Sequence, residues 1–164
     1  MSDVRIRAAT EADWSRIWPF FAATVRAGET YAFPMDLTAE TGRPWWFASP
    51  PGCTVVAEAD GVVLGSATMG PNRPGHGDHI GTASFMVAPA ARGRGVGRLL
   101  AEHVVAWHRE QGYRGVQFNA VVETNTAAVA LWQSLGFEIV GTVPGAFRSP
   151  QHGYVGLHVM FLPL

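Results

Sequence analysis

Short runs typical of strands recur in the first half of the chain, and residues 4–8 alternate apolar and polar positions. Residues 4–8, 53–59, 62–69 and 79–87 follow a pattern that is typical of strands. Asp60-Gly61 separates two of these runs, as in a hairpin turn. Thr10 precedes a helical pattern that extends to about Arg26 and is suited to cap it. A second, weaker helical pattern covers residues 38–47, so this half predicts four strands and two helices.

A helical period begins after Gly95 and dominates the following segment. Val96, Leu100 and Val104 fall on one face, and Gly112 supplies a stop signal. The pattern then predicts a strand over 115–120, a short helix over 125–135, and strands over 138–143 and 153–161. The resulting order, βααβββαβαββ, predicts an α+β fold around a mixed sheet, as one domain over residues 1–164.

Charge and cysteine content narrow the classes of partner. The net charge is −1, and all 12 basic residues are arginines. This balance gives no general attraction to nucleic acid or to an anionic membrane, and no apolar run has the length of a bilayer span. Cys53 is the single cysteine and has no partner for an internal disulfide. We therefore expect a cytoplasmic protein with neither nucleic acid nor membrane as a partner.

A glycine-rich segment lies between the strand at 79–87 and the next helix. Gly93, Gly95 and Gly97 alternate there with arginine and valine, and the helix that follows presents unsatisfied N–H groups. This combination predicts a site for a pyrophosphate-like anion. A P-loop is excluded because it needs a lysine, and the spacing also differs from the G-x-G-x-x-G of dinucleotide-binding turns.

These motifs resemble those of the GNAT acetyltransferase superfamily. Arg92-Gly93-Arg94-Gly95-Val96-Gly97, preceded by Val87-x-Pro89, is similar to its acetyl-CoA signature. The spacing of Asn125, Ala128, Leu131, Trp132, Leu135, Gly136 and Phe137 is similar to its second motif. The resemblance implies a GNAT-type mixed, largely antiparallel sheet, with splayed central strands flanked by helices.

The resemblance also implies how acetyl-CoA, the cosubstrate, is held. The backbone of Met86, Val87 and Ala88 would follow the pantetheine arm, and Asn125 would bond the arm or the sulfur end while capping its helix. The remaining cofactor-binding residues would surround the pyrophosphate: Arg92, Gly93, Arg94, Gly95, Val96, Gly97 and Arg98.

The implied reaction is direct attack of a neutral amine on the thioester, with a backbone N–H near Val87 stabilising the oxyanion. Trp132 stands where many relatives have an acidic tyrosine. His79 is a candidate base, because imidazole has a suitable pKa. Asp78 and His76 lie near it in the sequence, but no fourth ligand accompanies them and no metal is expected.

The acceptor would be a small-molecule amine, bound by loops that the resemblance places around the thioester. Asn119 and Asn125 are six residues apart, as in fungal acetyltransferases of proline analogues such as azetidine-2-carboxylate, and Thr82 stands where those enzymes have a third asparagine. Asn119, Asn125 and His79 are the catalytic candidates. The candidate acceptor-binding residues are Glu29, Tyr31, Phe33, Trp46, Thr82, Asn119 and Arg148.

Two other functions stay open at the level of the sequence. A non-catalytic acetyl-CoA sensor would use the same anion site, and a protein or peptide N-acetyltransferase would need a more open acceptor groove. Family members often dimerise, so a homodimer is also open.

Overall fold

The computed structural model describes residues 3–164, and the elements follow one another in the predicted order. Met1 and Ser2, where the expected domain begins, lie outside the described residues. The strands are β1 Arg5–Ala8, β2 Cys53–Ala59, β3 Val62–Pro71, β4 Ile80–Val87, β5 Gly115–Val122, β6 Glu138–Ser149 and β7 Gly153–Pro163. The helices are α1 Trp14–Ala27, α2 Ala39–Trp46, α3 Val96–Glu110 and α4 Thr126–Ser134, with short 3-10 turns at Glu11–Asp13, Gly75–Gly77 and Pro89–Ala91.

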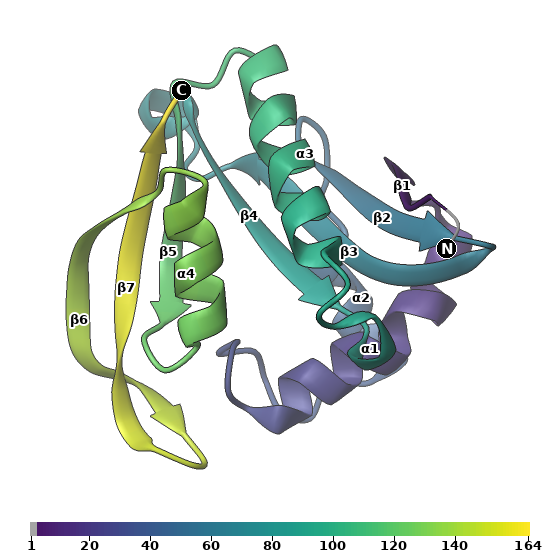
Figure 1. Cartoon of the computed structure of the whole chain (residues 1–164), viewed down its shortest axis with the longest axis horizontal. Helices are drawn as coiled ribbons and strands as arrows, with labels where there is room; N and C mark the ends of the chain where they lie inside the picture. The colour runs from purple at the N-terminus through teal and green to yellow at the C-terminus, as the bar shows by residue number, and fades with distance from the viewer. Residues whose placement is uncertain (1–2) are drawn as a thin grey trace.

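The seven strands form one sheet in the order β1-β2-β3-β4-β5-β7-β6. Every neighbouring pair is antiparallel except β4 and β5, which run parallel. These two strands pair only where Ile80 faces Gly115 and Gly81 faces Val116, and they then diverge (Figure 1). The predicted α+β fold, with a mixed, largely antiparallel sheet and splayed central strands, is confirmed.

Helices cover both faces of the sheet. On one face, Ile17, Phe21 and Val25 of α1 share a core with Trp46 of α2. On the other, α3 packs over β2 and β3, and both α3 and α4 contribute to the core over β5 and β7 (Figure 1). In the described part of the chain, no helix has the length and apolarity needed to cross a membrane.

A buried histidine lies where β4 and β5 are still paired. His108 of α3 is fully buried, and its Nδ1 donates to Val104 O at 2.8 Å. Its Nε2 has no hydrogen-bond partner among residues 3–164. A Cβ atom added at Gly81 would lie 2.1 Å from the ring, so the helix packs here directly on a glycine backbone. Burial lowers the pKa of His108, because the charged imidazolium is poorly solvated there.

This histidine predicts a loss of stability in mild acid. A lowered pKa in the folded state means that the unfolded chain binds the proton more tightly, so the contribution to stability is complete above about pH 6.5 and declines below it. Below that pH, we expect the free energy of unfolding to decrease by up to about 1.4 kcal/mol per pH unit. Urea unfolding at several pH values from 7 to 5 measures this decrease. In His108→Asn, the free energy of unfolding should depend less steeply on pH than in the wild type. Equal slopes for the two proteins would contradict the role of His108 in this pH dependence.

Candidate active site

The turn between β4 and α3 is open to solvent and shaped by glycine. Gly93 and Gly95 have φ angles of 74° and 78°, a left-handed conformation that glycine adopts without strain. A Cβ atom added at either residue would meet no other atom within 4 Å. The backbone is therefore accessible along this turn, where the anion site is expected.

The first turn of α3 supplies the hydrogen-bond donors. The N–H groups of Val96, Gly97 and Arg98 precede the first intrahelical bond, which joins Leu99 N–H to Gly95 O at 3.1 Å, and no side chain caps them. Free N–H groups and the positive end of the helix dipole favour an anion here. The resemblance also implies that the N–H groups of Arg92 and Arg94 surround the pyrophosphate. In the structure these groups bond Pro89 O and Ala91 O, each at 3.3 Å. Only the side chains of these two exposed arginines remain for a ligand.

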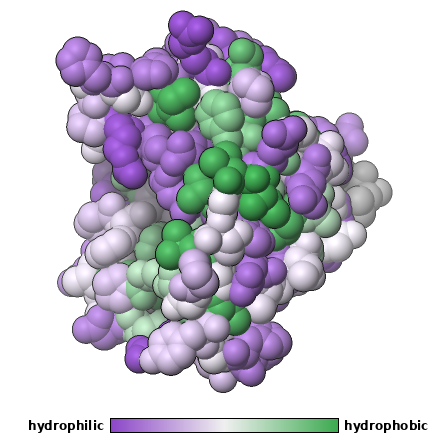
Figure 2. Space-filling model, turned by 90° about the vertical axis from the view of Figure 1, so that its left-hand side faces the viewer, coloured by the Kyte–Doolittle hydropathy of each residue, from purple (hydrophilic) through white to green (hydrophobic). Residues whose placement is uncertain are grey.

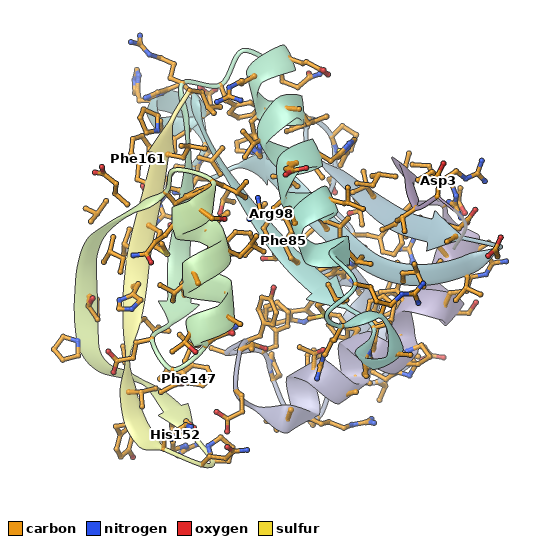
Figure 3. The ribbon with its side chains drawn as sticks, in the orientation of Figure 1. Asp3, Phe85, Arg98, Phe147, His152 and Phe161 are labelled. Carbon is orange, nitrogen blue, oxygen red and sulfur yellow. The ribbon has the colours of Figure 1, made fainter. Side chains whose placement is uncertain are left out.

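Arg98 connects the two helices on this face of the sheet. Its guanidinium donates to Ser134 Oγ of α4 at 2.7 Å and lies 3.5 Å from Glu102 of α3. Figure 3 shows Arg98 and Phe85 in the space between α3 and α4. The charge of Arg98 is therefore directed across the space between the helices.

We call the opening between Thr82–Val87 of β4 and Gln117–Val122 of β5 the β4–β5 gap. The N–H and C=O groups of successive strand residues point to opposite sides. Ala88 N–H bonds Leu64 O of β3 at 2.8 Å, so even-numbered residues of β4 face β3, and Ala83, Phe85 and Val87 face the gap. This corrects the expectation for Met86, whose backbone groups are directed toward β3. It also corrects the expectation for Ala88, whose N–H bonds Leu64 O and whose C=O accepts from Ala91 N–H at 2.8 Å. Of the three expected residues, only Val87 offers its backbone to the gap.

Aromatic side chains close the gap around Phe85. The Tyr31 hydroxyl donates to Phe85 O at 2.6 Å and accepts from Phe85 N–H at 2.9 Å. The Tyr31 ring stacks on Phe33, with 5.0 Å between ring centroids. On the α4 side, Trp132 packs 4.8 Å from the Phe85 ring and is buried. Trp132 therefore belongs to the core against which Phe85 packs.

Asn119 lies on an irregular part of β5. The register with β7 shifts between Phe118 and Val121, and this bulge leaves Asn119 exposed. Its Nδ2 donates to Asn72 Oδ1 at 2.7 Å, and its Oδ1 accepts from Gln117 Nε2 at 2.9 Å. Asn72, in the loop after β3, belongs to no motif, and no signal in the sequence pointed to it.

Asn125 begins α4 at the end of β5. Its Oδ1 accepts from Ala128 N–H at 3.4 Å, which confirms the expected helix cap. Since β4 and β5 diverge from their paired end at Gly115, Asn125 lies beyond the opposite end of β5, where the gap is open. Its side-chain NH₂ group is not used by the cap.

A hollow of about 250 Å³ adjoins β4 on the side of α2. Thr82, one of the expected acceptor residues, lies in its wall with Ser84 and Thr68. The lining is uncharged and mixes hydroxyl groups with apolar atoms. Its residues are Ala48, Ser49, Gly52, Thr68, Met69, Gly70, Pro71, Thr82, Ala83 and Ser84.

Other expected acceptor residues have different surroundings. Glu29 accepts from Ser149 Oγ at 2.7 Å and from Gln151 N–H at 3.3 Å, which ties the loop after α1 to the β6–β7 hairpin. Arg148 is exposed on that hairpin. The structure corrects the expectation for Trp46, which is only 1% exposed and donates to Ser66 Oγ, so it belongs to the core.

His79 lies apart from the other candidates. Its carbonyl accepts from Arg114 N–H beside the paired end of β4 and β5, and its side chain lines a separate hollow with Asp78 and Tyr113. Six residues of extended strand separate it from Phe85, a distance of about 20 Å. The structure therefore does not bring His79 to the gap. In the described part of the chain, no three His, Cys, Asp or Glu side chains form a group that could hold a metal ion.

The mixed sheet has parted central strands, and a glycine turn and a helix N-terminus lie beside the gap, a combination suited to an extended ligand with a pyrophosphate-like anion. The family model described as the acetyltransferase (GNAT) family matches residues 13–137, and the chain belongs to this family. It is therefore an acetyltransferase, and acetyl-CoA is its cosubstrate. The residues fit this molecule, because the turn is open, the N–H groups of α3 are free, and Val87 faces the gap.

Curated relatives and solved structures agree with the family. The chain is 28% identical over 156 residues to N-acetyltransferase aca1 of Schizosaccharomyces pombe, covering 85% of this chain and 75% of that protein. It is 30% identical over 149 residues to phosphinothricin N-acetyltransferase of Streptomyces coelicolor, covering 86% and 85%. A GCN5-related N-acetyltransferase structure from Kribbella flavida superposes with a TM-score of 0.95 at 59% identity, covering 98% of each chain.

Proposed function

We propose that the protein is a cytoplasmic, single-domain N-acetyltransferase that transfers the acetyl group of acetyl-CoA to the amine of a small amino-acid-like molecule. The observation that carries this proposal is the position of the β4–β5 gap between two unlike surfaces. The N-terminus of α3, the proposed anion site, lies beside one end of β4. A hollow of about 250 Å³, with an uncharged lining of hydroxyl groups and apolar atoms, lies on the α2 side of the same strand. The relative from Streptomyces coelicolor is named for phosphinothricin, an amino-acid analogue, which supports this class of acceptor.

In the proposed reaction, the lone pair of the neutral amine attacks the thioester carbonyl carbon, the C–S bond breaks, and the sulfur leaves as a thiolate. The amine nitrogen loses one proton to solvent water, and the thiolate takes up one proton to become the free thiol. Only the unprotonated amine can attack, so turnover should rise with pH until the pKa of the acceptor amine is reached. The backbone N–H of Val87, which faces the gap, is the proposed donor to the developing oxyanion. Asn119 and Asn72 are the proposed amide contacts of the acceptor.

Thiol release from acetyl-CoA tests the acceptor class. We expect turnover with a free amino acid, an amino-acid analogue such as phosphinothricin, or a proline analogue, and a product heavier by one acetyl group on nitrogen. A peptide that begins with the same residue is the matched control and should react more slowly. Turnover of peptides alone would favour a protein acetyltransferase. Acetyl-CoA binding without turnover of any amine, with polyamines and aminoglycosides included, would favour a sensor.

Asn125→Asp separates the two proposed roles of this residue. Aspartate caps a helix as well as asparagine does and suits its positive end, so the melting temperature should not fall. The variant lacks the side-chain NH₂ group, and losing one hydrogen bond to the substrate should lower kcat/KM about tenfold. Steady-state kinetics and a thermal melt measure both quantities. Unchanged turnover would leave Asn125 as a helix cap only.

The homodimer remains a prediction. Strand β6 is an edge of the sheet, at the left in Figure 1 and on the side of the molecule that Figure 2 turns toward the viewer. Its hydrophobic side chains Ile139, Val140 and Val143 are exposed. We propose this strand as the contact between two copies, because an edge strand has unpaired backbone groups as well as apolar surface. Light scattering of the protein, and of Val140→Lys, would show whether the mass is that of two chains and whether it depends on β6.

A further inference from the structure

Tyr31 provides the contact in the gap that neither motif explains. It lies in the loop between α1 and α2, 54 residues before Phe85, yet its hydroxyl bonds both Phe85 N–H and Phe85 O. These are the groups that a neighbouring strand would otherwise bond. The Tyr31 side chain therefore occupies the backbone hydrogen-bonding groups of Phe85. The backbone of Val87, the next residue of β4 that faces the gap, remains accessible to a ligand.

The Tyr31 side chain is firmly held. Its ring stacks on Phe33 with 5.0 Å between centroids, and Phe33 stacks on Phe21 of the α1 core at 5.9 Å. Burial raises the pKa of Tyr31 to about 12, so the hydroxyl keeps its proton at neutral pH and continues to donate to Phe85 O. Displacing the ring would cost two hydrogen bonds and a stacking contact.

Tyr31 therefore limits how far a ligand can extend along β4 into the gap. A chain that starts at the N-terminus of α3 and follows β4 reaches the backbone of Val87 first. Two residues further along it meets Phe85, whose backbone is closed by Tyr31 and whose ring is backed by Trp132 at 4.8 Å. The far end of such a chain is its acyl group.

We propose that Tyr31 determines acyl-chain length: it blocks the β4–β5 gap at Phe85, so that an acetyl group fits and a longer acyl group does not. This inference rests on the proposed acetyl-CoA site. A butyryl group has two more carbon atoms than an acetyl group, and it can be accommodated only if Tyr31 leaves Phe85. We expect butyryl-CoA to bind the wild-type protein about tenfold or more weakly than acetyl-CoA, since hydrogen bonds must be broken.

Calorimetric titration with acetyl-CoA and butyryl-CoA tests this inference without knowledge of the acceptor. Tyr31→Leu keeps an apolar contact with Phe33 but is too short to reach Phe85, and it should reduce the preference for acetyl-CoA to about threefold or less. Tyr31→Ala should give the same result. Tyr31→Phe keeps the stacked ring but lacks the hydroxyl that bonds Phe85, so its preference should fall between those of the wild type and Tyr31→Leu. Tyr154→Ala, at an exposed position on the β6–β7 hairpin, is the control and should match the wild type.

The outcomes distinguish this inference from the proposed function. Equal affinity of the wild type for both thioesters would overturn the role of Tyr31 while leaving the acetyl-CoA site in place. The role of Tyr31 would also be overturned if Tyr31→Leu bound acetyl-CoA and kept the wild-type preference. If Tyr31→Ala does not fold, the result for Tyr31→Leu alone tests this role. Failure of the wild type to bind either thioester would overturn the proposed function, and this inference with it.

Discussion

Replacing Gly95 with valine should reduce the affinity for acetyl-CoA by at least about 100-fold, which corresponds to about 2.7 kcal/mol. Gly95 has a φ of 78°, which a β-branched residue does not adopt without strain, and any side chain there occupies the open surface of the turn. Both effects disturb the N–H groups at the start of α3, where the pyrophosphate is proposed to bind. Isothermal titration calorimetry with acetyl-CoA measures the change.

Gly75 offers a matched control for this variant. It has a φ of 56° in the loop between β3 and β4, and an added Cβ atom would also meet nothing within 4 Å. Gly75→Val therefore carries a similar backbone strain at a position outside the anion site. Its affinity for acetyl-CoA should equal that of the wild type. An equal loss in both variants would show that strain, rather than the anion site, explains the result.

Gly81→Val should have the largest effect on folding. The new Cβ atom would lie 2.1 Å from Cδ2 of His108, which is fully buried between α3 and the sheet. Either α3 or β4 must shift, and such overpacking should lower the free energy of unfolding by about 3 kcal/mol. For a chain of this size, the melting temperature should fall by about 10 °C.

A second glycine of the sheet serves as the control here. At Gly141 of β6 an added Cβ atom would meet nothing within 4 Å. Gly141→Val should therefore change stability by no more than about 0.5 kcal/mol. Thermal unfolding of both variants, followed by circular dichroism, tests this account. A stable Gly81→Val protein would contradict the close packing of His108 on β4.

Local signals explain why so much of the fold could be predicted. The Asp60-Gly61 turn, the glycines before α3 and the Asn125 cap are each formed by residues only a few positions apart. Each of the three occurs where it was expected. The end of β6 was missed, because Pro144-Gly145 is typical of a turn. The strand continues to Ser149 because β7 pairs with it on both sides of an irregularity between Val143 and Phe147.

The details of the site depend on contacts between distant residues. Asn72 and Asn119 are 47 residues apart, and Tyr31 and Phe85 are 54 apart, so no spacing rule could pair them. The sequence also could not show which of two adjacent tryptophans of α2 faces the core. Trp45 is 50% exposed and Trp46 only 1%, because the packing against α1 and β3 sets the rotation of the helix.

Amide hydrogen exchange, measured by NMR with and without acetyl-CoA, tests the position of the cosubstrate most directly. The proposed site predicts that exchange slows at Val87 and at Val96, Gly97 and Arg98, whose N–H groups are free in the structure. Exchange in β1, at the far edge of the sheet, should not change. Protection confined to other residues, or no protection at saturating acetyl-CoA, would contradict a cosubstrate bound along β4 and the start of α3.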